Sequence, residues 1–282
     1  VYSTGVSLGI LFGFLFGGWL NEFFGWRVAF LVVGIPGILL AIIVRYTTAE
    51  PVRGSSEGRE AGETPGFKEV MNLLFIRKSF RYIALGAAFN AFCGYTLANW
   101  SASFMIRSYQ MPTGELGSWL ALIIGVGGAV GIVCGGALSD HMGKRDKRWY
   151  VWIPALGSFI MIPALIGQFT AQTASGSLLI MAIPGTLMNV YLGASIAITH
   201  SLVGLRMRST ASAILFLILN IIGLGCGPWT VGLLSDYLTP QFGDEALRHA
   251  MLYVTPVAMT ISGLLFLRAA KYLREDLAKA PE

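Results

Sequence analysis

Residues 209–236 read STASAILFLILNIIGLGCGPWTVGLLSD, and this stretch decides the fold class. It is longer than the about 20 mostly apolar residues that an α-helix needs to cross a bilayer. Small residues in such helices mark the faces where neighbouring backbones approach each other. The stretch is therefore predicted to be a membrane span, with a helix-packing face at Gly223, Gly227, Pro228 and Gly232.

The first residues repeat this design in VYSTGVSLGILFGFLFGGWL, where glycine recurs at every fourth position. Residues four apart lie on one face of a helix, so Gly9, Gly13 and Gly17 are predicted to form a second packing face. Such glycines either only hold helices together or let two rigid bundles rock against each other. The two matching spans, far apart in the chain, suggest an internal repeat.

Composition places the whole chain in a membrane. Hydrophobic residues make up 55% of the chain and charged residues 12%, with a mean hydropathy of +0.66, whereas soluble domains carry about 25% charged residues. The opening run lacks the basic start and cleavage site of a signal peptide, and without an initiator methionine the chain is expected to be a fragment. Eight spans are expected, at about residues 1–20, 26–44, 80–105, 116–138, 150–169, 177–202, 211–234 and 250–267.

The positions of lysine and arginine predict the orientation, because basic residues are retained on the cytoplasmic side of a membrane. With entry from the cytoplasm at Val1, the outside loops hold Arg27, Arg107 and Arg248, and all other basic residues lie inside. The net charge of +5 therefore reports topology and contact with membrane lipids, not nucleic-acid binding. The chain is predicted to be a multi-pass protein of the cytoplasmic membrane, with its linker and C-terminus in the cytoplasm.

One long polar break divides the chain. Residues 45–66, rich in Gly, Ser, Pro and Glu, cannot bury a core and are expected to form a flexible linker. After them, Phe67, Val70, Met71 and Leu74 share one helix face and predict a short amphipathic helix at the membrane surface. The predicted units are therefore two spans (1–44), a linker with this helix (45–79), and a block of six spans with a tail (80–282).

A motif after the second span of the six-span block points to a family. Residues 136–145 read GALSDHMGKR and resemble the Gly-x-x-x-Asp-Arg-x-Gly-Arg-Arg signature that the major facilitator superfamily carries between the second and third helices of each half. His141 departs from the basic residue of that signature. The resemblance implies an all-α membrane fold of twelve helices, of which this chain holds helices five to twelve.

Further segments are similar to the spinster-like branch of the same superfamily. They are GWRVAF at 25–30, EPVRG at 50–54, RWY at 148–150 and RMRSTASA at 206–213. The resemblance implies a secondary active transporter that moves an amphiphilic lipid-like substrate, such as a lysolipid or sphingoid lipid, with proton coupling. It also implies a protein that is monomeric at full length.

The same motif suggests a conformational latch made by Gly136, Asp140, Gly143, Lys144 and Arg145. The resemblance places Asp140 near the start of the first span, beside Ser3 and Thr4, where unpaired backbone N–H groups favour a carboxylate. There it would favour the outward-open state. Alternatively, Asp140 is a solvated loop acid that balances the neighbouring cations.

Polar residues within the spans are candidates for a substrate cavity. Asn90, Asn99 and Trp100 in the third span are favoured, and Tyr95, Asn189 and Asn220 are further candidates. Hydrogen bonding between helices is the alternative role of these side chains. None of the acidic residues falls in the middle of a span, although ion-driven transporters usually hold an ionisable group there. The coupling carboxylate is therefore expected in helices that this chain does not include.

Other chemistry is not indicated. Cys93, Cys134 and Cys226 lie singly in separate spans, no ligand spacing for a metal is present, and there is no phosphate-binding Gly-Lys-Ser/Thr loop. No cofactor and no enzymatic activity are expected. An organic-anion or sugar-acid symporter of the same superfamily is the alternative function, and it would need a basic residue in the cavity that these spans do not offer.

Overall fold

The computed structural model describes the backbone of residues 2–48 and 66–281, and the side chains from residue 8 onward within those ranges. Throughout them the chain is helical, with short turns and no strands. The elements are α1 (Tyr2–Phe24), α2 (Trp26–Thr47), α3 (Phe67–Ile76), α4 (Lys78–Tyr109), α5 (Thr113–Leu120), η1 (Ala121–Val126), α6 (Gly127–Gly143), α7 (Trp149–Thr170), α8 (Ala174–Leu187), α9 (Val190–Ser201), η2 (Leu205–Met207), α10 (Arg208–Ile218), η3 (Leu219–Cys226), α11 (Gly227–Phe242), η4 (Gly243–Glu245) and α12 (Ala246–Ala278).

The eight expected spans all fall on helices, so the all-α prediction is confirmed. They correspond to α1, α2, α4, α5–η1–α6, α7, α8–α9, α10–η3–α11 and α12. Five helical stretches among the described residues are long and apolar enough to cross a membrane, at Trp26–Thr47, Thr113–Gly143, Trp149–Thr170, Ala174–Ser201 and Leu205–Ala278. The last of them contains two of the expected spans, and α1 contributes the shorter apolar helix Leu8–Phe24.

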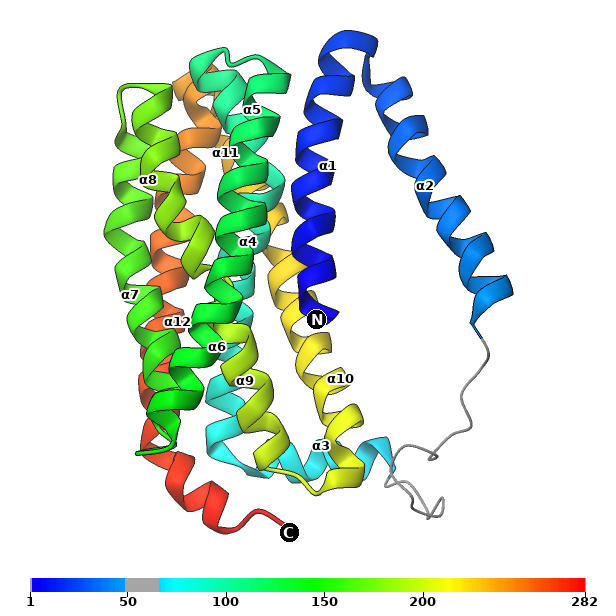
Figure 1. The fold of residues 1–282 in the computed structure, drawn as a ribbon. Coiled ribbons are helices and arrows are strands. Elements are labelled where there is room, and N and C mark those ends of the chain that lie inside the picture. Colours follow the sequence, from blue (N-terminus) through cyan, green and yellow to red (C-terminus); the bar gives the residue numbers. More distant parts are fainter. Residues whose placement is uncertain (1, 49–65, 282) are drawn as a thin grey trace.

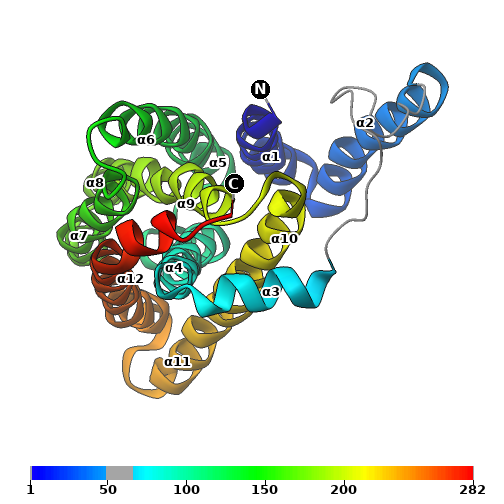
Figure 2. The same ribbon diagram turned by 90° about the horizontal axis from the view of Figure 1, so that it is seen from below.

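The spans run up and down side by side (Figure 1). We call the end that carries α3, the α6–α7 loop and the last turns of α12 the linker end, and the end that carries the α1–α2 turn and the start of α5 the hairpin end. Seen along the spans, α4 lies among the other helices of the six-span block, while α1 and α2 lie to one side (Figure 2).

Two clusters of buried side chains form the core of the six-span block. One includes Phe104, Phe169 and Met251 towards the hairpin end, and the other includes Phe80, Phe266 and Leu74 of α3 towards the linker end. In α2, by contrast, Ala29 is the one residue that is buried. The block is thus a packed unit, and α2 leaves its apolar side chains exposed.

A helix forms where the amphipathic segment is expected. Val70 and Leu74 of α3 are buried, whereas Phe67 and Lys68 are exposed, and the helix lies across the linker end against α10 and α4 (Figure 2). Residues 49–65 of the expected linker lie outside the described residues.

Two spans contain π-helical segments. The segment η1 interrupts the α5–α6 span, and η3 interrupts the α10–α11 span. π-helical turns inside α-helices are uncommon and often occur at functional sites. Both segments here lie at helix contacts, η1 beside α1 and η3 beside α4.

The glycines of η3 and α11 pack closely against α4. A Cβ atom added at Gly223 would lie 2.8 Å from Cβ of Ala91, and one at Gly227 would lie 2.7 Å from the carbonyl oxygen of Phe92. Only glycine permits this approach to α4. Gly232 faces the indole of Trp100, whose Nε1 donates to the carbonyl oxygen of Pro228 at 2.9 Å.

Candidate functional site

The helix α1 meets α5 along a seam at the hairpin end (Figure 1). A Cβ atom added at Gly18 would lie 2.7 Å from the carbonyl oxygen of Thr113 and 2.9 Å from Cα of Gly117, so the two backbones are nearly in contact. Beside this crossing, Trp19 Nε1 donates to Ser118 Oγ at 2.9 Å. The seam is therefore built from backbone proximity, from the Trp19 indole that lies against Gly114, and from single hydrogen bonds.

A carboxylate closes the seam at the last turn of α1. The backbone N–H of Gly114 donates to Glu22 Oε2 at 2.6 Å. Gly114 belongs to the first turn of α5, where unpaired N–H groups carry partial positive charge and stabilise an anion. Asn21 Nδ2 adds a longer hydrogen bond to Thr113 Oγ1 at 3.4 Å. Glu22 thus bridges the two-span segment and the six-span block.

The glycine stripe of α1 does not form the predicted packing face. A Cβ atom added at Gly9, Gly13 or Gly17 would meet no atom within 4 Å. Gly13 and Gly17 instead border an open-sided cavity of about 240 Å³ between α1, α4 and α5. Its other lining residues include Phe14, Ala102, Ile106 and Leu120. The close contact of α1 belongs to Gly18, one position away, because adjacent residues point about 100° apart around a helix.

One face of α4 continues from this cavity towards the middle of the span. Tyr95, Asn99, Ala102 and Ile106 follow one another at spacings of three and four residues and therefore share a face. Asn99 is exposed and its Nδ2 donates to the carbonyl oxygen of Tyr95 at 2.8 Å. Tyr95 Oη donates to Asn220 Oδ1 of η3 at 3.3 Å. Asn99 and Asn220 are thus the predicted cavity residues that the structure brings to one accessible surface.

The other predicted cavity residues lie elsewhere. Asn90 is 2% exposed, and its Nδ2 donates to Ser158 Oγ of α7 at 3.1 Å inside the six-span block. Trp100 is half-buried between α4 and α11. Asn189 is half-buried at the start of α9, with its Nδ2 beside Gly128 of α6. These three side chains serve contacts between helices, so their assignment to a cavity with Asn99 is wrong.

The motif at residues 136–145 forms the end of α6 and the loop that follows it. Asp140 is exposed and accepts a hydrogen bond from Tyr150 Oη at 2.8 Å. A Cβ atom at Gly143 would overlap the ring of Tyr150, which would then have to move away from Asp140. Gly136 has open space beside it, and Lys144 and Arg145 are exposed. The side chains of Ser3 and Thr4, the expected partners of Asp140, lie outside the described residues.

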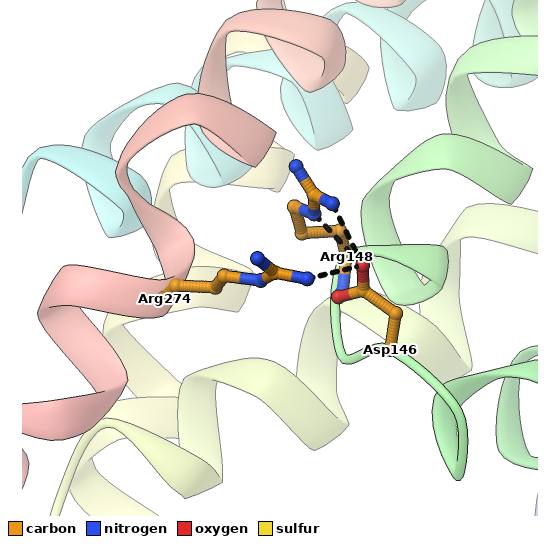
Figure 3. Close-up of polar contacts among 3 residues, drawn as sticks. All are labelled: Asp146, Arg148 and Arg274. Atoms are coloured by element: carbon orange, nitrogen blue, oxygen red, sulfur yellow. Dashed lines mark hydrogen bonds and ion pairs between the residues drawn. The ribbon is translucent and has the colours of Figure 1, made fainter.

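The acid inside the basic run Lys144–Arg148 organises the loop. Asp146 Oδ2 lies 2.9 Å from Nη2 of Arg148 and 2.8 Å from Nη2 of Arg274, a residue of α12 (Figure 3). Its Oδ1 accepts from the backbone N–H of Arg148 at 3.0 Å. Hydrogen bonds from Arg148, followed by that from Arg274, lower the pKa of Asp146 to about 2. The carboxylate therefore ties the α6–α7 loop to α12 at the linker end.

The sequence carries a signal for Asp146 but none for the contact of Glu22. Asp146 is the only acid within the basic run Lys144–Arg148, which makes it the natural ion-pair partner in that run. Glu22 follows the apolar run of α1 directly after Asn21, but nothing in the sequence indicates that the first turn of α5 lies beside it.

Comparison with known proteins identifies the family. The profile of the Major Facilitator Superfamily matches residues 1–228. The chain therefore belongs to the Major Facilitator Superfamily, and the predicted fold class is confirmed.

Individual relatives show which members of the family the chain resembles. A bacterial homolog of the human lysosomal transporter Spinster, solved in an inward-facing and unoccupied conformation, superposes with a TM-score of 0.74 at 28% identity, over 99% of this chain and 70% of that one. An MFS-type efflux pump of Mycolicibacterium smegmatis is 32% identical over 99% of this chain and 65% of its own length. The sphingosine-1-phosphate transporter SPNS2 of Danio rerio is 23% identical over 99% of this chain and 60% of its own. The predicted resemblance to spinster proteins is confirmed. The chain spans less than two thirds of the length of the efflux pump and of SPNS2.

Proposed function

We propose that this chain is the alternating-access core of a secondary active transporter that moves an amphiphilic, lipid-like substrate with proton coupling. The observation that carries the proposal is the seam between α1 and α5. It joins the two-span segment to the six-span block through Gly18, Gly117 and Glu22, beside a cavity that Ala102 and Ile106 of α4 help to line.

Alternating access needs contacts that hold one end of two bundles together and can be released. A seam of touching backbones and a few hydrogen bonds supports this role, because few contacts must break and Ile10 and Phe14 pack only at the edge of the core. The hairpin end, which we propose faces outward, is the closed end here. This arrangement agrees with the inward-facing conformation named for the bacterial Spinster homolog.

The cavity lining supports an amphiphilic substrate. The residues that line it are glycine and apolar side chains together with Asn21 and Thr113. Beyond it, Tyr95, Asn99 and Asn220 supply hydroxyl and amide groups on the same side of α4. Among the described lining residues there is no lysine, arginine or histidine, which an organic-anion symporter would need. The cargo in the name of the Danio rerio relative, sphingosine-1-phosphate, supports the same class of substrate.

The remaining features of the proposal follow from the family. The protein would lie in the cytoplasmic membrane as a monomer, with the linker end in the cytoplasm and lipids around it. Asp140 would latch the two bundles at that end in the opposite conformation, in which its present hydrogen bond to Tyr150 is exchanged for one to α1. The coupling proton would bind a carboxylate outside the described spans.

A disulfide across the seam tests the proposal. Asn21→Cys together with Thr113→Cys replaces a pair of short side chains that face each other across the seam, with Asn21 Nδ2 and Thr113 Oγ1 3.4 Å apart. In the protein taken from its native membrane and placed in liposomes with a pH gradient, we expect oxidation to reduce the flux of a fluorescent lysophospholipid at least tenfold, and reduction to restore it. The single variant Thr113→Cys is the control.

Two outcomes contradict the proposal. Unchanged flux in the oxidised pair would show that the seam does not open during transport. Saturable flux of an organic anion, such as a sugar acid, without flux of the lysophospholipid would assign the substrate to the alternative class.

A further inference from the structure

The linker ends of α4 and α12 carry a cluster of cations and aromatic rings. Tyr82 of α4 and Tyr272 of α12 stack with ring centroids 5.7 Å apart and an interplanar angle of 13°. Lys78 Nζ lies 5.2 Å from the ring centroid of Tyr272, and the guanidinium carbon of Arg268 lies 5.7 Å from that of Tyr82. A pair of stacked rings is thus flanked by one cation from each helix. We call these four residues the tyrosine pair cluster.

Both cations of the tyrosine pair cluster are exposed. Among the described residues, neither Lys78 nor Arg268 forms an ion pair with a carboxylate. The two nearest acids along α12 are engaged elsewhere, since Glu275 binds Lys279 Nζ at 2.6 Å and Asp276 accepts from the backbone N–H of Ser79 at 2.7 Å. The cluster therefore presents two cations that form no direct ion pair among the described residues, although the Glu275 carboxylate is near enough to attract Lys78.

An exposed apolar wall continues from the cluster towards the middle of the spans. Leu85 of α4 is 39% exposed, and Leu264 and Leu267 of α12 are 55% and 44% exposed. Leu85 lies about one helical turn beyond Tyr82, and Leu264 about one turn beyond Arg268 on the same face. The two helices thus offer aliphatic side chains in the bilayer and cations with aromatic rings at its edge.

This order of groups matches a phospholipid. The acyl chains of a lipid would lie along the leucines, while its phosphate would reach Lys78 and Arg268 at the depth where tyrosine prefers to sit in membranes. Basic sites between transmembrane helices on the basic side bind anionic headgroups through such charge complementarity. We propose that the tyrosine pair cluster is a binding site for the headgroup of an anionic glycerophospholipid, distinct from the surface of Tyr95, Asn99 and Asn220.

Native mass spectrometry of the purified chain in mild detergent tests the site, with phosphatidylglycerol and phosphatidylcholine as the titrated probes. We expect phosphatidylglycerol to bind more tightly than phosphatidylcholine. The double variant Lys78→Gln/Arg268→Gln should weaken phosphatidylglycerol binding by about fivefold for each cation removed. Tyr272→Leu, which removes one ring, should weaken it as well, whereas Tyr272→Phe should not.

A matched control is available at the same end of the molecule. Lys144→Gln/Arg145→Gln removes the same two charges from exposed positions in the α6–α7 loop and should leave phosphatidylglycerol binding within about twofold of the unaltered chain. Thermal unfolding of each variant confirms that it is folded.

Three results would overturn the site. They are equal binding of the two lipids, unaltered phosphatidylglycerol binding in Lys78→Gln/Arg268→Gln, and an equal loss in the control variant, which would mean that only overall charge attracts the lipid.

Discussion

The glycines of α1 and those of η3 and α11 follow similar sequence patterns but differ in what lies beside them. Gly223 and Gly227 touch the backbone and side chains of α4, whereas Gly9, Gly13 and Gly17 face open space. In the first region glycine permits permanent packing inside the six-span block. In the second region it leaves room for a cavity, and among the described glycines of α1 the close contact falls on Gly18.

This difference separates a contact inside the six-span block from the seam, which we propose can be released. The contact between α4 and η3 adjoins both core clusters, which contain Leu97 and Leu219. The seam between α1 and α5 has Ile10 and Phe14 at the edge of the core and is otherwise held by hydrogen bonds. Substitutions in the first region should therefore affect folding, and those in the second should affect the position of α1.

The largest expected effect is a loss of stability when Gly227 is substituted. In Gly227→Ala the new Cβ would lie 2.7 Å from the carbonyl oxygen of Phe92, and such overpacking costs about 1–3 kcal/mol. Thermal unfolding in detergent should show a clear fall in the midpoint. Gly13→Ala is the control, because nothing lies within 4 Å of its new Cβ and alanine is the better helix former. Equal midpoints for the two variants would remove the distinction between the regions.

Substitution of Gly18 is expected to change the position of α1 and to affect stability less. In Gly18→Ala the new Cβ would meet Cα of Gly117 at 2.9 Å, so α1 should move away from α5 while the six-span block stays folded. Spin labels on exposed residues of α1 and α5 should report a longer and broader distance distribution, with a nearly unchanged unfolding midpoint. Gly17→Ala, one position away, should leave the distances as they are. A folding defect in Gly18→Ala would instead make the seam part of the fixed core.

Neutralising the Glu22 carboxylate should displace α1 less than Gly18→Ala does. In Glu22→Gln the side chain can still accept from Gly114 N–H, but the charge that favours the helix N-terminus is gone, which costs about 0.3–1 kcal/mol. The same spin-label distances should shift partway towards those of Gly18→Ala. Glu115→Gln, a neutralised acid in the same first turn of α5, serves as the control. Equal shifts in both variants would show that total charge, not the Glu22 contact, holds the seam.

The smallest effect is expected for the ion pairs of Asp146 at the linker end, whose contribution to stability depends on pH. The pKa of Asp146 is lowered from 3.8 to about 2, so its ion pairs stabilise the folded state above pH 3.8 and lose that contribution as the pH falls through about 2. Thermal midpoints measured between these values should fall less in Asp146→Asn than in the unaltered chain. Because each exposed pair contributes about 0.2–1 kcal/mol, the difference should be a few degrees at most. Parallel curves for the two proteins would show that Asp146 does not stabilise the fold.

The spans and the amphipathic helix could be predicted because they depend on run length and periodicity. The helix faces that are buried in contacts could not be predicted, because they depend on how each helix is rotated against its neighbours. Nine residues amount to about two and a half turns, so the spacing alone places Asn90 and Asn99 on opposite sides of α4. Which of these two sides is buried depends on the rotation of α4. Asn90 is buried against α7, and Asn99 is exposed. The same limit explains why the contact of α1 belongs to Gly18 and not to Gly17.

The π-helical segment η3 also affects how the sequences of distant relatives should be aligned. A π-helical turn holds more residues than an α-helical turn, so residues after Cys226 are displaced around the axis relative to an uninterrupted helix that begins at Arg208. A periodicity counted from α10 therefore assigns the wrong side to residues of α11. Alignments of distant relatives across Leu219–Cys226 should accordingly place any single-residue gap within this segment, where it changes the winding and not the hydrophobic pattern on either flank.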